Sequence, residues 1–381
     1  MKRNSICSFL ILLCVIATTS FVHAQGPMPC GNYRIDTAAE NQAMKFRMIN
    51  PKTPLVANAV IRVYFHNVTN DDGTNAAITA SQLKTEFATL LASYAAANIC
   101  FINAGTDTVN NTFLNTLFNA VNDPEGTFFA PYQVPGCINC FYTQIINGNN
   151  TACIPPCGIG GVALGGIPGT FFLVSKGNIG PGATISHEMG HCLGLLHTFE
   201  TSTGYEKIDG SNSLIAGDKI ADTPADPYAY SGSACFQTSA NKCTFTGICP
   251  DPNNATNYTP PYSNLMAYWW SGKDAKGVFV DCYPDLSLTN GQFARINSFL
   301  SSTPALINCI SSTYLTQFGI TVSSGYYMSS ALYTYTTSGN VLFNGSSKAL
   351  IGGGKVNLEP GFHANPSAGG QMKITVQPCN Y

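Results

Sequence analysis

Charged side chains are scarce in this 381-residue chain, where 18 lysines and arginines and 20 aspartates and glutamates make up only 10% of the residues. They form no basic cluster of the kind that neutralises a phosphate backbone, so nucleic acid is not an expected partner. Long apolar runs are missing too, and no stretch of the chain is expected to span a membrane. Composition leaves the oligomeric state open.

Residues 1–24 have the pattern of a cleaved signal peptide. Lys2 and Arg3 precede an apolar run from Phe9 to Ile16, and the segment ends in Val22-His23-Ala24. The apolar run is too short for a bilayer-spanning helix. Removal of the segment leaves 16 basic and 20 acidic residues, a net charge of about −4. We therefore expect a secreted, extracellular protein.

Histidine is rarer still, since the chain has only six, and three of the five outside the signal peptide lie in the segment HEMGHCLGLLH. On a helix that turns about 100° per residue, His187 and His191 lie about 40° apart and can reach one metal ion. Gly194 can adopt a positive φ that turns the chain back toward that ion. His197 then supplies a third nitrogen.

Three neutral imidazoles leave a fourth coordination position open for water, which is typical of a catalytic zinc site and not of a structural one. Zinc lowers the pKa of its water toward about 7, and Glu188 could take that proton and pass it to a leaving amine. A buried helix without a metal ion would gather three polar rings and a carboxylate at a cost in free energy. The segment therefore predicts zinc as cofactor and peptide hydrolysis as reaction.

The pattern HExxHxxGxxH resembles that of the metzincin zinc peptidases. A second segment, Asn264-Leu265-Met266-Ala267-Tyr268, resembles their Met-turn, and its methionine comes 69 residues after His197. The resemblance implies that Met266 forms a hydrophobic floor beneath the histidines. It also implies Tyr268 as a group that stabilises the transition state.

Two further segments narrow the resemblance to the pappalysin or cytophagalysin-like secreted enzymes. They are GDKIADTPADP at 217–227 and LTNGQFARI at 288–296. The likeness covers roughly residues 57–308 and implies a metzincin-like catalytic domain there. In the first segment Asp218, Asp222 and Asp226 recur every four residues and could give oxygen ligands to calcium, which the resemblance also suggests. Solvated surface carboxylates are the alternative.

The cysteines fit an oxidising compartment. Two of the 15 leave with the signal peptide, so an odd number remains and at least one thiol is expected free. Cys192, on the core side of the zinc helix, is one candidate. Cys137 and Cys140, followed by Cys153 and Cys157, favour local disulfides over a second, structural zinc site.

Cys30 is the other candidate for a free thiol. It lies in residues 25–56, where we expect a short pro-segment or N-terminal extension. A thiolate from this segment could occupy the open zinc position and keep the enzyme latent as a zymogen. An ordinary disulfide at Cys30 is the alternative.

The distribution of apolar residues predicts an α+β fold, a mixed sheet plus the active-site helix. Val60–Val68 is a β-branched and aromatic run, and a capping box at Thr79 opens a helix. Gly161–Gly166 and Thr170–Ser175 are predicted strands just before the zinc helix. One of them could form the edge of the substrate cleft and hold an extended peptide by main-chain hydrogen bonds. The alternative is that both strands belong only to the core.

Residues 309–381 differ in composition and predict a small all-β module, since Ser, Gly, Tyr and Thr dominate short alternating runs. Residues 356–364 resemble the stacked β-repeats appended to many secreted Bacteroidetes proteins. Cys309 and Cys379 bracket the module and could bridge its ends. Tyrosines such as Tyr314 and Tyr326 could contact a glycan or a cell surface, against strand packing as the alternative.

Together these features predict a secreted zinc endopeptidase that hydrolyses protein or peptide substrates with Glu188 as general base. A zinc amidase acting on cell-wall peptides or glycans is one alternative, which the low charge and the tyrosines permit. A non-catalytic secreted adhesin is the other. The intact Glu188 argues against the adhesin, because a scaffold does not need a base.

Overall fold

The computed structural model describes residues 28–30, 35–49, 59–97, 99–148, 159–180, 183–227, 236–239, 242–245, 257–269, 271–273, 279–281, 286–310, 312–322, 326–343, 348–358, 363–365 and 371–376. The expected signal peptide, Cys153, Cys157 and Cys379 lie outside these residues. No helix in the described part combines the length and the apolar character needed to cross a bilayer.

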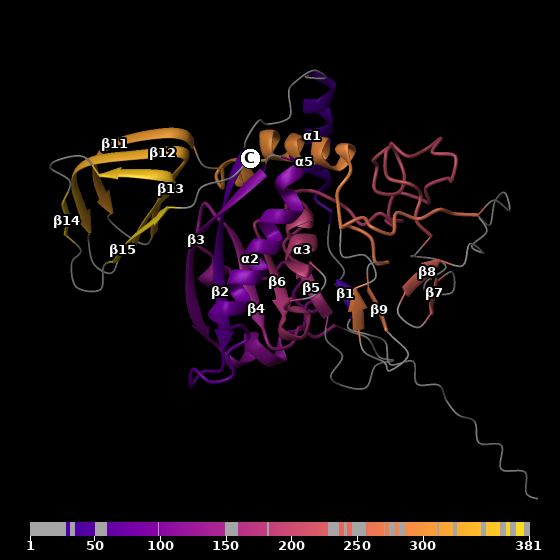
Figure 1. Ribbon diagram of the computed structural model, residues 1–381, viewed down its shortest axis with the longest axis horizontal. Helices are drawn as coiled ribbons and strands as arrows, with labels where there is room; N and C mark the ends of the chain where they lie inside the picture. The colour runs from indigo at the N-terminus through magenta and orange to yellow at the C-terminus, as the bar shows by residue number, and fades with distance from the viewer. Residues whose placement is uncertain are drawn as a thin grey trace, which may run out of the picture.

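A mixed six-stranded sheet forms the centre of the fold, in the order β1-β5-β6-β4-β2-β3 (Figure 1). The pairs β2/β3, β2/β4 and β4/β6 are parallel, whereas β5 is antiparallel to β6. Strand β1 runs parallel to β5 at the end of the sheet. The strands are β1 Met28–Cys30, β2 Ala59–Thr69, β3 Ile99–Asn110, β4 Ile138–Thr143, β5 Ile159–Ala163 and β6 Phe171–Ser175.

Helices α2, Ala80–Tyr94, and α3, Thr184–Cys192, lie in front of this sheet in Figure 1, and α1, Thr37–Ile49, lies beside α5, Asn290–Ser302. The capping box predicted at Thr79 is confirmed, since Thr79 and Gln82 bond reciprocally. Thr289 and Gln292 make the same arrangement at the start of α5. Short helical segments are Ala95–Ala97, Phe113–Leu117, Ala130–Tyr132, Lys176–Asn178 and α6, Pro304–Ile307.

Two buried clusters cover the two faces of the sheet. The larger one joins β2, β4 and β6 to α2, α3 and α5, with Phe65, Tyr142 and Phe299 among its side chains. The second packs Phe141 and Leu173 under the long connection between β3 and β4. The α+β prediction of a mixed sheet with an active-site helix agrees with this arrangement, and the predicted strand Val60–Val68 is confirmed as β2.

The local disulfides predicted for Cys137, Cys140, Cys153 and Cys157 are wrong for the first two residues, because neither Cys137 nor Cys140 is part of a disulfide. They are three positions apart at strand β4 and so contribute to opposite faces of the sheet. Cys140 lies in the larger cluster, whereas Cys137 packs in another with Tyr64. Cys309 is also a free buried thiol, so the predicted bridge to Cys379 is wrong. Its thiol donates to the Ala305 carbonyl within the core.

Two other cysteines differ in their bonding state. Cys192 is a free buried thiol, as predicted from its place on the core side of the zinc helix. Cys100 on β3 is disulfide-bonded.

Beyond residue 311 the described backbone consists of strands. They are β11 Ser312–Val322, β12 Tyr326–Phe343, β13 Lys348–Leu358, β14 His363–Asn365 and β15 Gln371–Val376, all paired in parallel. This sheet stands to the left of the six-stranded sheet in Figure 1. The predicted stacked β-repeats stay a prediction, and the tyrosine side chains lie outside the described part. Two small hairpins, β7 Phe236–Ser239 with β8 Lys242–Phe245 and β9 Ser271–Lys273 with β10 Phe279–Asp281, complete the strands.

Candidate metal centre

Helix α3 carries the first part of the histidine segment. It starts at Thr184, after Ala183 in a left-handed conformation with φ 49°, and ends at Cys192. Its inner face is fully buried against the larger cluster. Gly194 follows with φ +93°, a conformation in which other residues are strained. The chain therefore leaves the helix at the position that the sequence predicts and returns toward it.

This turn brings the three histidines together. The Nε2 atoms of His187, His191 and His197 lie 3.1, 3.1 and 3.2 Å apart. Nitrogens bound to one tetrahedral ion at about 2.0–2.1 Å would lie about 3.3–3.4 Å apart, so the triangle is close to the base of a zinc site. Among the residues that the structure describes, no other group of three His, Cys, Asp or Glu side chains is arranged to share an ion.

Backbone carbonyls fix the orientation of two of the rings. Nδ1 of His187 lies 2.7 Å from the Leu265 carbonyl oxygen, and Nδ1 of His191 lies 2.8 Å from that of Leu195. A carbonyl oxygen only accepts, so each Nδ1 must donate and each Nε2 is left with its lone pair toward the centre. His197 stacks on Phe199 with the ring centroids 4.6 Å apart.

Burial also fixes the charge of these rings. It lowers the pKa of His187 to about 4, and it lowers the pKa values of His191 and His197 well below the ordinary range. The positive charge that a neighbouring histidine would carry adds to this effect at His191 and His197. All three imidazoles are therefore neutral near pH 7, which is the form that binds a metal ion.

Met266 lies beneath the helix that carries the first two histidines. A Cβ atom added to Gly190 would lie 2.5 Å from the Met266 sulfur, so a larger residue there would require the Met266 side chain to move. The turn around Met266 is held by Asn264, whose Oδ1 accepts from the Met266 amide at 2.9 Å. Asn264 also exchanges two hydrogen bonds with Gln292 of α5, at 2.8 and 3.0 Å. The segment has the position expected of a Met-turn.

Tyr268 borders the histidine cluster. Its ring centroid lies 4.8 Å from that of His197 and 5.7 Å from that of His187. It also contacts Phe199 at 4.6 Å. The residue is only partly buried, which leaves it beside the imidazoles at the boundary with solvent.

Glu188 is fully buried and lies against strand β5. A Cβ atom on Gly161 would meet the Glu188 Oε1 atom at 2.5 Å and its Cγ atom at 2.7 Å. Gly161 is thus a residue of the site that the sequence analysis counted only as part of a strand. Its only signal in the sequence is a glycine pair inside a short apolar run.

Gly161→Ala is expected to displace the Glu188 carboxylate while the three histidines stay in place. With Glu188 as the general base that the sequence predicts, we expect kcat to fall roughly 10- to 100-fold with unchanged zinc content, because small misplacements of such a group are costly. The matched control is Gly177→Ala, since a Cβ atom there meets nothing within 4 Å. Equal kcat values for both variants would show that the contact with Gly161 is irrelevant.

The three aspartates expected to bind calcium each have separate hydrogen bonds. Asp222 accepts from Thr289 Oγ1 and the Gly291 amide at the start of α5, at 2.7 and 2.8 Å. Asp226 accepts from Thr198 Oγ1 at 2.6 Å and from Trp269 Nε1 at 2.9 Å. Calcium binding by these three residues stays a prediction.

Asp218 differs from the other two aspartates. It is fully buried, and its Oδ1 accepts from the Ile220 amide and Thr223 Oγ1. Its Oδ2 atom has no hydrogen-bond partner, and neither does Oε2 of the buried Glu206 nearby. Burial, with the charges of Asp218 and Asp226, raises the pKa of Glu206 to about 8. Glu206 is a residue that the sequence analysis missed.

Cys30 is described only in its backbone. It pairs with Gly161 in the register between β1 and β5. The segment that carries Cys30 therefore runs along the strand against which Glu188 packs.

Comparison with known proteins agrees with this geometry. Residues 144–276 match the model of the Peptidase M43 family, described as pregnancy-associated plasma protein-A. This match and the histidine cluster show a metalloendopeptidase, in which residues 144–276 are similar to the M43 peptidases. The matched range includes strands β5 and β6, helix α3 with His187 and His191, the following turn with His197, and the segment around Met266.

Proteins similar to this chain include three fungal proteins named extracellular metalloprotease. The one from Arthroderma gypseum is 28% identical over 253 residues, which cover 63% of this chain and 79% of the relative. The one from Podospora anserina is 28% identical over 266 residues, or 64% and 73%. The one from Verticillium alfalfae is 29% identical over 263 residues, or 64% and 78%.

Proposed function

We propose that this protein is a secreted zinc endopeptidase that cleaves protein substrates with Glu188 as general base. The observation that carries the proposal is the set of three neutral imidazoles whose Nε2 atoms converge within 3.2 Å, on the same helix and turn as a fully buried glutamate. Secretion is supported by the signal-like residues 1–24 and by the names of the fungal relatives.

His187, His191 and His197 would hold the zinc ion, which when bound supplies Lewis-acid chemistry, polarising a carbonyl group and lowering the pKa of water. Glu188 takes a proton from the attacking water and delivers it to the leaving amine nitrogen. Tyr268 donates a hydrogen bond to the oxygen on which negative charge develops. The Leu265 carbonyl orients the His187 ring, and Met266 packs against the helix that carries His187 and His191.

Strand β5 is the edge on which an extended substrate would pair. Strands that add to a sheet edge gain main-chain hydrogen bonds, and β5 lies next to Glu188. In the structure this edge is paired with β1. We infer that β1, in the expected pro-segment, occupies the edge of β5 on which the substrate would pair. It must therefore leave before hydrolysis.

Within this segment we propose Cys30 as the group that blocks the zinc ion. Cys30→Ser is expected to abolish latency, so that the expressed chain cleaves a denatured protein without prior processing. The comparison is the parent chain, tested before and after removal of its N-terminal segment. A Cys30→Ser zymogen as latent as the parent would contradict the switch and would leave β1 as a strand that blocks only by pairing.

The proposed division of the chain follows the sequence analysis: signal peptide 1–24, pro-segment or N-terminal extension 25–56, catalytic domain 57–308 and β module 309–381. The elements β2 to α6 lie inside the third range. We propose that the β module contacts a cell surface or a glycan and takes no part in hydrolysis. A chain that ends after Cys309 should then keep kcat on a soluble protein and lose retention on cells.

Of the three aspartates predicted to bind calcium, we propose that Asp218 does so together with Glu206, since each has a buried carboxylate oxygen without a hydrogen-bond partner. Burial raises the pKa of Asp218 to about 7, and that of Glu206 is about 8. Without calcium the folded protein holds protons on both groups that the unfolded chain releases at lower pH, so its stability falls as pH rises through this range. A bound cation removes the repulsion between the two carboxylates.

Calcium is therefore expected to raise the Tm at about pH 8 by more than at about pH 5, as measured by thermal unfolding with and without the ion. Glu206→Gln should remove the response. Asp209→Asn, at an exposed carboxylate of the same loop that accepts from the Ser211 amide, should keep it. A Tm that does not change when calcium is added, at either pH, would contradict the proposed calcium site.

Digestion assays separate the proposed function from its alternatives. The endopeptidase should cleave a denatured protein mixture and leave peptidoglycan intact. A cell-wall amidase would act on the peptidoglycan, and an adhesin would act on neither.

A further inference from the structure

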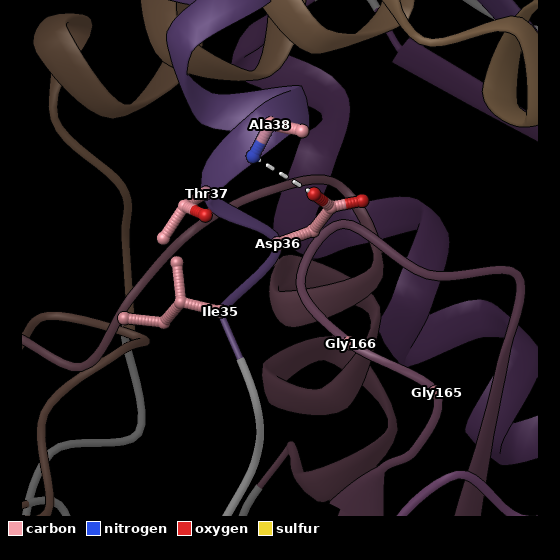
Figure 2. A pocket seen from close by; sticks show the side chains of 6 residues that line it. All are labelled: Ile35, Asp36, Thr37, Ala38, Gly165 and Gly166. Atoms are coloured by element: carbon pink, nitrogen blue, oxygen red, sulfur yellow. Dashed lines mark hydrogen bonds between the residues drawn. The ribbon is translucent and has the colours of Figure 1, made fainter.

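The described part of the N-terminal segment contains two elements with different attachments. Strand β1 touches the catalytic region by pairing with β5. Helix α1 instead begins where Ile35 forms a bridge with Ile167 and the Asp36 amide donates to the Ile167 carbonyl at 3.0 Å. Figure 2 shows Asp36 at the start of α1, where its carboxylate accepts from the Ala38 amide at 3.0 Å, next to Gly165 and Gly166.

Glu40 on α1 is one of the few buried acidic side chains, with an exposed fraction of 5%. Its Oε1 atom lies 2.9 Å from Arg295 Nη2 on α5, and its Oε2 atom lies 2.7 Å from Lys219 Nζ. Burial alone would raise the pKa of Glu40, but hydrogen bonds and charges from Lys219 and Arg295 outweigh it and lower the pKa. The carboxylate is therefore ionised and paired on both oxygens.

Arg295 continues the chain of contacts into the metal centre. Its Nε atom donates to the Gly194 carbonyl at 2.7 Å. The guanidinium also lies over the Phe299 ring, 5.3 Å from its centroid, and that ring occupies the space where a Gly194 side chain would lie. One face of α5 thus holds the glycine turn that separates the second and third histidines.

The Gly194–Leu195 peptide group, whose carbonyl accepts from Arg295, lies next to a hydrogen bond that orients His191. The Gly194 carbonyl belongs to the peptide bond that leads into Leu195, and the Leu195 carbonyl accepts from Nδ1 of His191. Rotation of the Gly194–Leu195 peptide would change the orientation of the His191 ring and the path to His197. Arg295 without Glu40 would be a buried cation with one partner fewer, free to leave the Gly194 carbonyl.

We propose that Glu40 is a positioning residue for the metal centre, which it serves by holding Arg295 on the Gly194 carbonyl. Helix α1 is then part of the working peptidase, and only the chain before it belongs to the removable segment. The residues 25–56 thus divide into a blocking strand and a retained helix.

The test compares Glu40→Gln with Gln42→Ala in the full chain, both after maturation. Gln42 is a matched control, because its side chain ties the same helix to the Ser302 carbonyl at 2.8 Å without touching Arg295. Glu40→Gln should lower kcat about tenfold or more with KM within about twofold, and should shift the visible absorption of the cobalt-substituted protein. Gln42→Ala should leave kcat and the cobalt spectrum unchanged.

Two results would overturn the proposal. One is a Glu40→Gln variant with the kcat and cobalt spectrum of the parent. The other is an equal loss in Gln42→Ala, which would reduce the role of Glu40 to docking the helix. If Glu40→Gln does not fold, the N-terminal residue of the active parent enzyme tests the proposal instead. The N-terminal residue of the active parent enzyme should lie at or before Thr37, and an active form that starts after Ile49 would exclude the proposal.

Discussion

Replacing Glu188 by alanine should lower kcat by about 10³ or more while the protein still binds about one zinc ion per chain, because the change removes the proton acceptor and leaves the three imidazoles in place. A loss of this size corresponds to about 4 kcal/mol in the activation free energy. The measurements are cleavage of a peptide substrate under saturating conditions and the zinc content of the same sample.

Glu188→Gln is the control for shape, since it keeps the side-chain volume against Gly161 but cannot accept the proton. It should lose as much activity as Glu188→Ala. Undiminished turnover in either variant would remove Glu188 from the mechanism.

His191→Ala should lose both zinc and activity. The Nε2 atom of His191 lies 3.1 Å from those of both other histidines, so its removal leaves only two ligands. We expect zinc occupancy below roughly a tenth after dialysis and proteolysis at the background level. The Tm of the variant should also cease to rise when zinc is added, because the ion no longer binds the folded state preferentially.

His66→Gln is the matched control for that loss, because His66 is a second fully buried histidine with a different set of contacts. Its Nδ1 lies 2.7 Å from Asp107 and its Nε2 lies 3.0 Å from the Asn139 side chain, and the ring stacks on Phe141. The variant should be less stable than the parent but should keep one zinc ion. Full zinc occupancy in His191→Ala would contradict the assigned ligand set.

Local sequence patterns predicted the parts of the structure that depend on residues close together in the chain. Two histidines one helical turn apart and a glycine that can adopt a positive φ define the shape of the metal centre without reference to distant residues. The capping box at Thr79 and the strand of β-branched residues at Val60–Val68 are equally local, and both are present in the structure.

Contacts between distant segments explain what the sequence could not show. Gly161 matters because β5 passes beside Glu188, and Glu206 matters because its loop folds onto Asp218, yet neither approach has a periodic pattern. The cysteine pair misled for a related reason. Local disulfides were expected in an oxidising compartment, but Cys137, directly before β4, and Cys140, within it, pack on opposite faces of the sheet.

The link from Glu40 to Gly194 extends this point. Glu40 and Arg295 are 255 positions apart in the chain, and only the packing of α1 on α5 makes them partners. No local pattern around Arg295 in the sequence indicates this pairing. Its Nε contact with the zinc-motif glycine connects that helix to the histidines.

The most direct test is elemental analysis of the purified, matured protein, combined with proteolysis before and after chelation. We expect about one zinc ion per chain, loss of proteolysis when the ion is removed and recovery when zinc is returned. Proteolysis that persists in metal-free protein would contradict the zinc-dependent mechanism.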